Sequence, residues 1–239
     1  MRVLVTRPER AAARTLERLR ALGHDPIPFP VTAAEQHPEP VREALKKPHS
    51  AILVTSAEAV RVLRSLGDAI FSHLGETVFA VGEATATVLR ETGFSDIRIA
   101  EGTGASMIRL FGGEFAQLAA ISPLLYLAGH PRSPALEAGL ADLGAAVNVV
   151  EAYRMHPLPL TSGAVKAALC HPPVHAVLFY SRETARQFFK VTTGDVLGAL
   201  LGVPLLCLSA NVSEAIPDSL HSNIRVAAGP DEESLLALL

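Results

Sequence analysis

Six short turns, rich in hydroxyl groups, could bind a polar ligand. Each turn directly follows a run of apolar residues. The turns are Thr6-Arg7-Pro8, Thr55-Ser56-Ala57, Gly82-Glu83-Ala84-Thr85, Ala128-Gly129-His130, Ser181-Arg182-Glu183 and Ser209-Ala210-Asn211. Hydroxyl groups recur in these turns, and lysine is absent from all of them. Hydroxyl and backbone N–H groups donate hydrogen bonds, so this chemistry suits a ligand with many carboxylates.

The position of the turns supports a binding role. In parallel α/β sheets, ligands bind beyond the carboxyl ends of the strands, where helix N-termini offer free N–H groups. The alternative for any single turn is that its Thr, Ser or Asn only caps the following helix. The residues predicted to bind the ligand are Arg7, Thr55, Ser56, Gly82, Thr85, Gly129, Arg132, Ser181, Arg182 and Asn211.

Arginine and tyrosine side chains add two further kinds of chemistry. Arg7, Arg132 and Arg182 follow apolar runs, and a guanidinium is a planar fork that can hold a carboxylate or phosphate. Tyr153 is one of three tyrosines and lies in a proline-flanked segment rather than in a core strand. Its phenol could donate a proton to a leaving group, which makes it the candidate catalytic residue. The alternative is a half-buried tyrosine that hydrogen-bonds to the backbone.

Several familiar site motifs are missing. Gly102 and Gly104 resemble the start of a dinucleotide fingerprint, but the third glycine is absent, so no nicotinamide cofactor is expected. His171 and His175 are four residues apart, but the prolines between them prevent a shared helical face, and no metal site is predicted. Neither a Gly-x-Ser-x-Gly elbow nor a Walker-type motif occurs. The chain is therefore expected to act without a cofactor.

Length and composition indicate an ordinary packed protein. With 239 residues, 49% of them hydrophobic and 19% charged, the chain can form two domains of about 100 to 120 residues each. A formal net charge of -3 gives no reason to expect nucleic acid. The longest apolar stretch, Val196 to Leu208, is too short for a membrane span and contains Pro204. These features predict a cytoplasmic protein with no membrane contact.

The chain consists of three sequence units that occur twice in the same order. The segment from Met1 resembles that from Pro123, His49-Ser-Ala-Ile-Leu-Val resembles Val174-His-Ala-Val-Leu-Phe, and Val78-Phe-Ala-Val resembles Leu205-Leu-Cys-Leu. Each unit has a continuous apolar run, which is typical of a strand buried on both faces, followed by helical periodicity. The duplication therefore predicts an α/β fold of two similar domains, each a parallel β-sheet flanked by helices.

Two proline-rich segments interrupt the repeat at equivalent points, Asp25 to Val31 and Glu151 to Leu160. Both are predicted to be extended connectors that pair as a two-stranded hinge. On this interpretation one domain is discontinuous, with residues 1–33 and 154–239, and the second comprises residues 34–153. The hinge would let the domains move relative to each other. A simple tandem division into two successive domains is the alternative.

Taken together, these motifs resemble the uroporphyrinogen-III synthase family over essentially the whole chain. The segments that resemble the family are Val5-Thr-Arg-Pro, Val54-Thr-Ser-Ala-Glu-Ala-Val, Ala80-Val-Gly-Glu-Ala-Thr-Ala, the region Gly129 to Arg132, Glu151-Ala-Tyr-Arg, and Val226-Ala with the leucine-rich end. The resemblance implies cyclisation of hydroxymethylbilane, a linear tetrapyrrole, to uroporphyrinogen III in heme biosynthesis, with loss of water and inversion of the terminal ring. It implies a monomeric hydro-lyase without cofactor, which contacts the upstream bilane-forming enzyme at most transiently.

Four positions depart from the family pattern. Ala128 replaces the usual arginine, Tyr180 and Val212 stand where threonines are common, and Ser209 replaces a glycine. These departures leave a rival interpretation open, in which a non-catalytic protein binds a tetrapyrrole or polycarboxylate in the same interdomain cleft. A third interpretation, a two-domain sugar- or amino-acid-binding protein, normally requires an export signal, which the sequence does not show.

Overall fold

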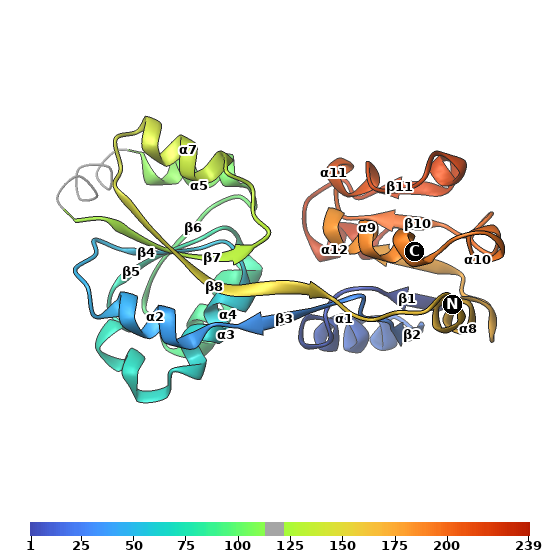
Figure 1. The fold of residues 1–239 in the computed structure, drawn as a ribbon, viewed down its shortest axis with the longest axis horizontal. Coiled ribbons are helices and arrows are strands. Elements are labelled where there is room, and N and C mark those ends of the chain that lie inside the picture. Colours follow the sequence, from blue (N-terminus) through green and yellow to red (C-terminus); the bar gives the residue numbers. More distant parts are fainter. Residues whose placement is uncertain (113–121) are drawn as a thin grey trace. The chain divides into compact units, whose positions relative to one another are not determined.

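The chain forms two compact α/β units. The computed structural model describes residues 1–112 and 122–239. Unit 1 comprises Met1–Ala33 and His156–Leu239, and unit 2 comprises Ala34–Met155. Each unit contains one β-sheet with helices packed against it (Figure 1). Among the described residues, no helix has the length and apolar character that crossing a bilayer requires.

Unit 1 contains a five-stranded parallel sheet with the order β11-β10-β9-β1-β2. Its strands are β1 (Arg2–Val5), β2 (Asp25–Pro28), β9 (Ala176–Phe179), β10 (Leu205–Cys207) and β11 (Ile224–Val226). Its helices are α1 (Glu9–Ala21), α8 (Ser162–Cys170), α9 (Arg182–Val191), α10 (Asp195–Gly198), α11 (Ala210–Ser213), the 3₁₀ helix η2 (Asp218–Asn223) and α12 (Glu232–Leu236).

Unit 2 contains the second sheet, with the order β3-β8-β7-β4-β5-β6. Its strands are β3 (Thr32–Gln36), β4 (Ile52–Val54), β5 (Thr77–Ala80), β6 (Asp96–Ile99), β7 (Leu124–His130) and β8 (Val147–Pro157). Its helices are α2 (Pro38–Leu45), α3 (Ala57–Ser65), the 3₁₀ helix η1 (Gly67–His73), α4 (Glu83–Thr92), α5 (Gly104–Phe111) and α7 (Ala135–Asp142). The pairs among β4, β5, β6, β7 and β8 are parallel.

Both sheets are covered by helices on both faces, which explains the continuous apolar runs. In β4, Ile52 and Val54 belong to the same core as residues of α3, whereas Leu53 belongs to a second core with residues of α5 and α7. In β1, Leu4 packs with the core that includes α8 and α9, and Val3 with the core that includes α1 and α12. A strand with both faces buried requires apolar residues at successive positions. All six apolar runs predicted as strands are strands.

One connector differs from the prediction. The segment predicted as an extended link from Asp25 onward begins with β2, which pairs in parallel with β1 inside the sheet of unit 1. Its prolines are tolerated because β2 is an edge strand, where one row of N–H groups has no partner in the sheet. The links between the units instead run through β3 and β8, which are hydrogen-bonded neighbours. Movement at this pair and independent folding of the two units stay predictions.

Candidate functional site

The turn after β4 places two hydroxyl groups beside two tyrosines of the same unit. The hydroxyl groups of Thr55 and Tyr126 are 3.2 Å apart and share a hydrogen bond. The Ser56 hydroxyl accepts a hydrogen bond of 3.1 Å from the Glu58 N–H and thereby caps α3. Burial raises the pKa of Tyr126 above its ordinary value, and the hydrogen bond with Thr55 opposes that shift. The turn thus has both a capping function and donors that can face a ligand.

Tyr153 lies on β8 and packs against the core of unit 2 that contains β4. Burial raises the pKa of its phenol, which therefore stays protonated at neutral pH, and Ser56 hydrogen-bonds to it with the opposite effect. Gly129 on β7 faces the ring so closely that a Cβ atom there would overlap the phenol. A glycine is therefore required at position 129 for β7 to approach the Tyr153 ring this closely. The side chain of Ser56 is a polar neighbour of the phenol, and both the proton-donor role of Tyr153 and its structural alternative stay predictions.

The turn after β5 leaves backbone donors available. Gly82 is the N-cap residue of α4 and has no side chain that could accept from the first turn. Within the described residues, the exposed Glu83 and Ala84 have no acceptor for their N–H groups. Thr85 is buried, and its hydroxyl group makes no hydrogen bond to a described residue. This helix N-terminus has the free N–H groups and positive dipole end that attract a carboxylate.

The predicted turn Ala128-Gly129-His130 is instead the end of β7 and pairs with β8, because the strand continues past its apolar run. The arginine that follows β7 is in an ion pair within the chain. Arg132 Nε donates to Glu137 Oε1 at 2.6 Å, and this contact raises the pKa of Arg132. Ala128, which departs from the family pattern, is fully buried in the core with Leu136. A ligand carboxylate near Arg132 must therefore compete with Glu137.

Unit 1 has a different arrangement, centred on Glu232 of α12. Its Oε1 accepts from Arg7 Nη1 at 2.9 Å, from the Tyr180 hydroxyl at 3.0 Å and from Thr15. Its Oε2 accepts from Arg18 at 3.1 Å. Burial on its own raises the pKa of Glu232, but the hydrogen bond from Thr15 and the charge of Arg7 outweigh it and lower the pKa. Arg7, one of the two predicted ligand arginines of this unit, is therefore held by a carboxylate of the same chain.

The Arg7 guanidinium also stacks on Tyr180, with 4.2 Å between its Cζ and the ring centroid. Burial raises the pKa of Tyr180, and the charge of Glu232 raises it further. Tyr180 stands where the family pattern has threonine, and a threonine is too short to make the same stacking contact. This departure therefore belongs to the network around Glu232.

The other two turns of unit 1 are also engaged with residues of the chain. Ser181 caps α9, accepting from the Thr184 N–H at 3.1 Å and donating to its hydroxyl at 2.8 Å. Arg182 is 3.4 Å from Asn211 Oδ1 and 3.3 Å from Glu214 Oε2. Val212, one of the four positions that depart from the family pattern, is buried in the core of unit 1. These contacts favour the capping interpretation for Ser181.

Sequence reasoning missed two residues that contact these turns, Tyr126 of β7 and Glu232 of α12. Tyr126 stands inside an apolar run, where an aromatic residue indicates core packing and not a polar contact. Glu232 follows Arg7 by 225 positions, and no spacing rule links them. Neither the arginine nor the acidic residue has a local pattern that identifies its partner.

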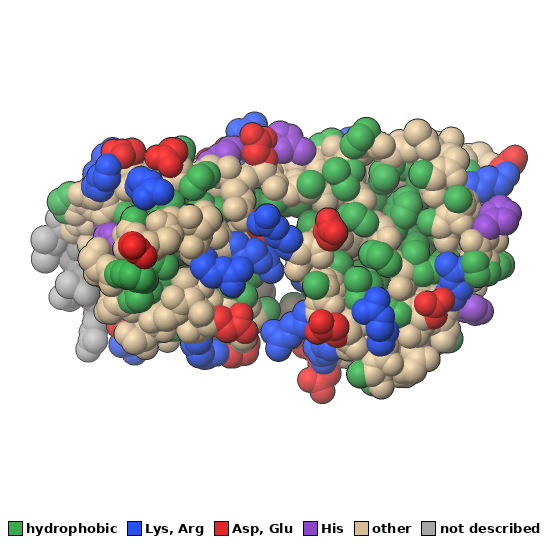
Figure 2. Space-filling view, turned by 90° about the horizontal axis from the view of Figure 1, so that it is seen from below, with side chains coloured by type: hydrophobic (Ala, Val, Ile, Leu, Met, Phe, Trp, Pro, Cys, Tyr) green, Lys and Arg blue, Asp and Glu red, His purple; other side chains and the backbone are tan. Residues whose placement is uncertain are grey.

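The surface drawn in Figure 2 has basic and acidic side chains mixed over both units. Among the described residues, one group of side chains has the composition and proximity to hold a metal ion: His49, His73 and Glu76. These residues precede β4 and β5, whereas the predicted binding turns follow the same strands. The group therefore lies at the opposite end of the strands from those turns.

Comparison with known proteins identifies one family over nearly the whole chain. The model of the family described as uroporphyrinogen-III synthase HemD matches residues 13–237. Comparison with curated protein sequences gives no match. The uroporphyrinogen-III synthetase structure from Helicobacter pylori is similar with a TM-score of 0.64 and 17% identity, covering 100% of this chain and 98% of that chain.

A second similar structure is a mutant uroporphyrinogen III synthase from Thermus thermophilus. It has a TM-score of 0.56 and 23% identity, and the match covers 90% of this chain and 87% of that chain. These two likenesses establish the fold. Because the family model matches most of the sequence, this chain belongs to the uroporphyrinogen-III synthase family.

Proposed function

We propose that this protein cyclises hydroxymethylbilane to uroporphyrinogen III, with loss of water and inversion of the terminal ring. The observation that carries the proposal is the family match over residues 13–237. The hydro-lyase chemistry and the roles of individual residues are part of the proposal. The polar turns at the strand ends support it, because the substrate presents many carboxylates that need hydrogen-bond donors.

Unit 2 supplies the principal carboxylate contacts in this proposal. The N–H groups of Glu83 and Ala84, together with the Thr85 hydroxyl, have no partner among the described residues and can each donate to a carboxylate. Thr55 adds a hydroxyl whose present partner is another hydroxyl. A hydrogen bond to a charged group contributes about 1.5 to 3 kcal/mol, so a few such contacts suffice for tight binding.

Tyr153 is the proton donor in the proposed mechanism. The phenol proton joins the leaving hydroxyl group, which departs as water when its C–O bond breaks. A departing hydroxide is the conjugate base of water, whose pKa is about 15.7, so it accepts a proton even from a phenol with a raised pKa. Pyrrole nitrogen lone pairs stabilise the resulting carbon cation. The proton that the macrocycle loses on closing restores the phenol, and the net reaction releases one water.

Positioning contributes more to the proposed rate than the acid does. Holding the reacting carbon against the substituted carbon of the last ring can contribute about 7 to 11 kcal/mol. One general acid contributes roughly 100- to 10,000-fold in rate, which corresponds to about 3 to 5 kcal/mol. The site therefore needs a rigid set of donors more than it needs a cluster of reactive side chains.

Product analysis tests the proposal directly. Hydroxymethylbilane is incubated with the purified full chain, and the isomers of the cyclised product are separated. We expect mainly the type III isomer, whereas the spontaneous reaction yields type I. A product mixture identical to that of the uncatalysed reaction contradicts the proposal.

The rival function, non-catalytic binding of a tetrapyrrole or polycarboxylate, is favoured by the departures from the family pattern at Ala128, Tyr180, Ser209 and Val212. The pairing of Arg7 and Arg132 with carboxylates of the chain reduces the positive charge available to a ligand under either function. A chain that binds the linear substrate but leaves the isomer ratio unchanged supports this second function.

A further inference from the structure

We propose that His49, His73 and Glu76 form a site for one zinc-class divalent cation at the N-terminal end of β4 and β5. The three residues offer two imidazole nitrogens and a carboxylate, and their ligand atoms all lie within 4.8 Å of one another. Two histidines and one glutamate are a ligand set that zinc accepts, with a fourth position left for water. This proposal is independent of the proposed function.

Two contacts bring the ligand atoms together. His49 Nε2 is 2.9 Å from Glu76 Oε2, and His73 Nδ1 is 2.8 Å from Glu76 Oε1. A tetrahedral zinc ion with ligands at about 2.0 to 2.1 Å separates them by roughly 3.3 to 3.4 Å. The two contacts use different oxygens of Glu76, so binding through one of these oxygens requires the three ligand atoms, which now lie within 4.8 Å of one another, to adjust to this separation. The two imidazole rings stack with 5.9 Å between their centroids, so both face the same carboxylate.

The backbone around the cluster orients His49 as a metal ligand. Its Nδ1 is 2.7 Å from the Lys47 carbonyl oxygen, which can only accept a hydrogen bond. Nδ1 must therefore hold a hydrogen, and in the neutral ring Nε2 has the lone pair. That lone pair faces a carboxylate oxygen, so either a proton or a cation must lie between them. Histidine ligands of metals usually have this kind of backbone partner behind them.

His73 and Glu76 are held in one turn. The Glu76 N–H donates to the His73 carbonyl oxygen at 3.0 Å, directly after η1. The side chains of both histidines are largely buried, with exposed fractions of 6% for His49 and 15% for His73. Preformed and partly desolvated ligands lose little conformational freedom when an ion binds.

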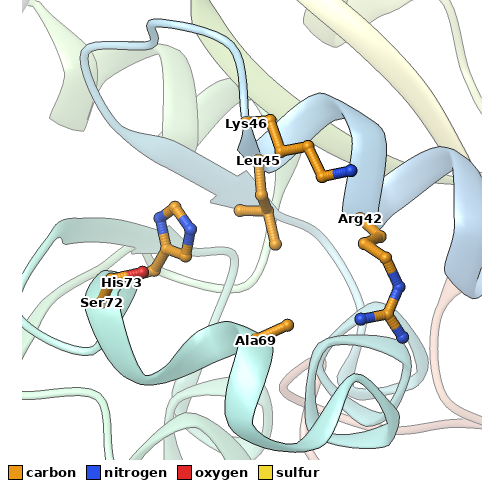
Figure 3. A pocket seen from close by; sticks show the side chains of 6 residues that line it. All are labelled: Arg42, Leu45, Lys46, Ala69, Ser72 and His73. Carbon is orange, nitrogen blue, oxygen red and sulfur yellow. The ribbon is translucent and has the colours of Figure 1, made fainter.

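A pocket lies beside His73. Its volume is about 430 Å³. The residues that line it are Arg42, Leu45, Lys46, Ala69, Ser72 and His73 (Figure 3). His73 is the member of the cluster that belongs to this lining, so the pocket reaches the cluster from the side of His73. Lys46 and Arg42 are paired with Glu43 and Glu39, respectively, which offsets their positive charge beside the proposed site.

Variants that keep the hydrogen bonds to Glu76 but remove the metal ligands distinguish a zinc site from a cluster that only stabilises the fold. Glutamine places its amide nitrogen near the position of a histidine Nε2, so His49→Gln can still donate to Glu76. Asparagine does the same for Nδ1, which suggests His73→Asn. The matched control is His37→Asn, because His37 Nδ1 and His130 Nδ1 lie 3.6 and 3.9 Å from the Glu151 carboxylate, in a histidine–glutamate–histidine group that is more open than the proposed site.

The experiment titrates Zn²⁺ alone into the full chain by calorimetry. We expect one site per chain in the parent, binding at least about tenfold weaker in His49→Gln and in His73→Asn, and an unchanged site in His37→Asn. The thermal midpoint of the parent should rise by roughly 5 °C at zinc concentrations 100-fold above Kd, and that of either ligand variant should not.

Three outcomes contradict the proposal. The first is a parent chain without a one-to-one site for zinc. The second is that both ligand variants bind zinc as tightly as the parent. The third is that His37→Asn loses as much affinity as the ligand variants do. Co²⁺ gives an independent measurement, because a tetrahedral nitrogen and oxygen site produces visible absorption bands. The bands should appear in the parent and be lost in the ligand variants. Their absence from the parent also overturns the proposal.

Discussion

The two units have the same βα architecture but use the ends of their strands differently. In unit 1, the arginine after β1 is bound to Glu232, and Tyr180 donates to the same carboxylate. In unit 2, the turn after β5 has an uncapped helix N-terminus, and the turn after β4 places Thr55 beside a tyrosine hydroxyl. The duplicated backbone is retained, whereas the polar contacts around it have diverged.

This difference shows how one scaffold can serve two roles. A turn whose donors are satisfied by the chain stabilises the unit, because a buried charge with several partners is costly to disrupt. A turn whose donors lack acceptors contributes little to stability but can contribute to binding. We therefore expect changes in unit 2 to affect catalysis first and changes around Glu232 to affect stability first.

The largest expected effect is that of Tyr153→Phe. The ring and its packing remain, so only the proton donor and its contact with Ser56 are lost. We expect turnover to fall about 100-fold or more with little change in KM, since the phenol acts in the transition state. The measurement is steady-state cyclisation of hydroxymethylbilane. Turnover within threefold of the parent would leave Tyr153 with only a structural role.

Gly129→Ala should be the most destabilising change near the site. The added methyl group overlaps the Tyr153 ring, so one of them must move. Overpacking of this kind costs about 1 to 3 kcal/mol. Gly198→Ala is the matched control, because a methyl group there meets no atom within 4 Å. The free energies of unfolding in urea compare the two variants, and equal values would argue against the close approach.

Glu232→Gln should reduce the stability of unit 1 by about 2 kcal/mol at neutral pH, because it removes the charge that Arg7 and Arg18 share. The control Glu214→Gln breaks the exposed pair with Arg182 and should change stability by less than about 0.5 kcal/mol. Chemical denaturation of the three proteins measures this difference. If both variants lose the same stability, the contrast between the half-buried network of Glu232 and the exposed pair of Glu214 does not hold.

The contribution of Glu232 should also depend on pH. Its pKa is lowered in the folded state from an ordinary value of 4.5, so the stabilisation is fully present above that value. It is lost as the pH falls through the folded pKa. The difference in unfolding free energy between the parent and Glu232→Gln should therefore decrease below about pH 4.5 and not near neutrality. A difference that stays constant down to pH 3 contradicts the assignment.

The smallest expected effects are those of single hydroxyl groups in the turns. Thr85→Ala should remove one hydrogen bond to a substrate carboxylate, about 1.5 kcal/mol at the low end of the range for a charged acceptor, and raise KM about tenfold. Ser181→Ala in unit 1 should raise KM less, because that hydroxyl is already engaged with Thr184. The KM values of Thr85→Ala and Ser181→Ala show which of the two hydroxyl groups contributes more to substrate binding. A larger effect at Ser181 would reverse the proposed division of roles.

Local patterns in the sequence were sufficient for most of the fold. The runs at Val3 and Ile52 identify strands because a strand buried on both faces must be apolar at every position. The duplication indicates two similar units because each copy contains a complete set of strands, turns and helices. The prolines after Asp25 suggested a connector, but an edge strand also tolerates proline, so the pattern does not distinguish the two.

The site was only partly accessible from the sequence. The hydroxyl-rich turns could be identified because parallel strands place their carboxyl ends at one edge. The ion pair of Arg7 with Glu232 and the cluster of His49, His73 and Glu76 join residues from separate segments. The sequence alone determined the strands of the six apolar runs and the helices that follow them, because those depend on residues close together in the chain. Only the tertiary structure decided which charges and imidazoles meet, because such contacts depend on how distant segments pack.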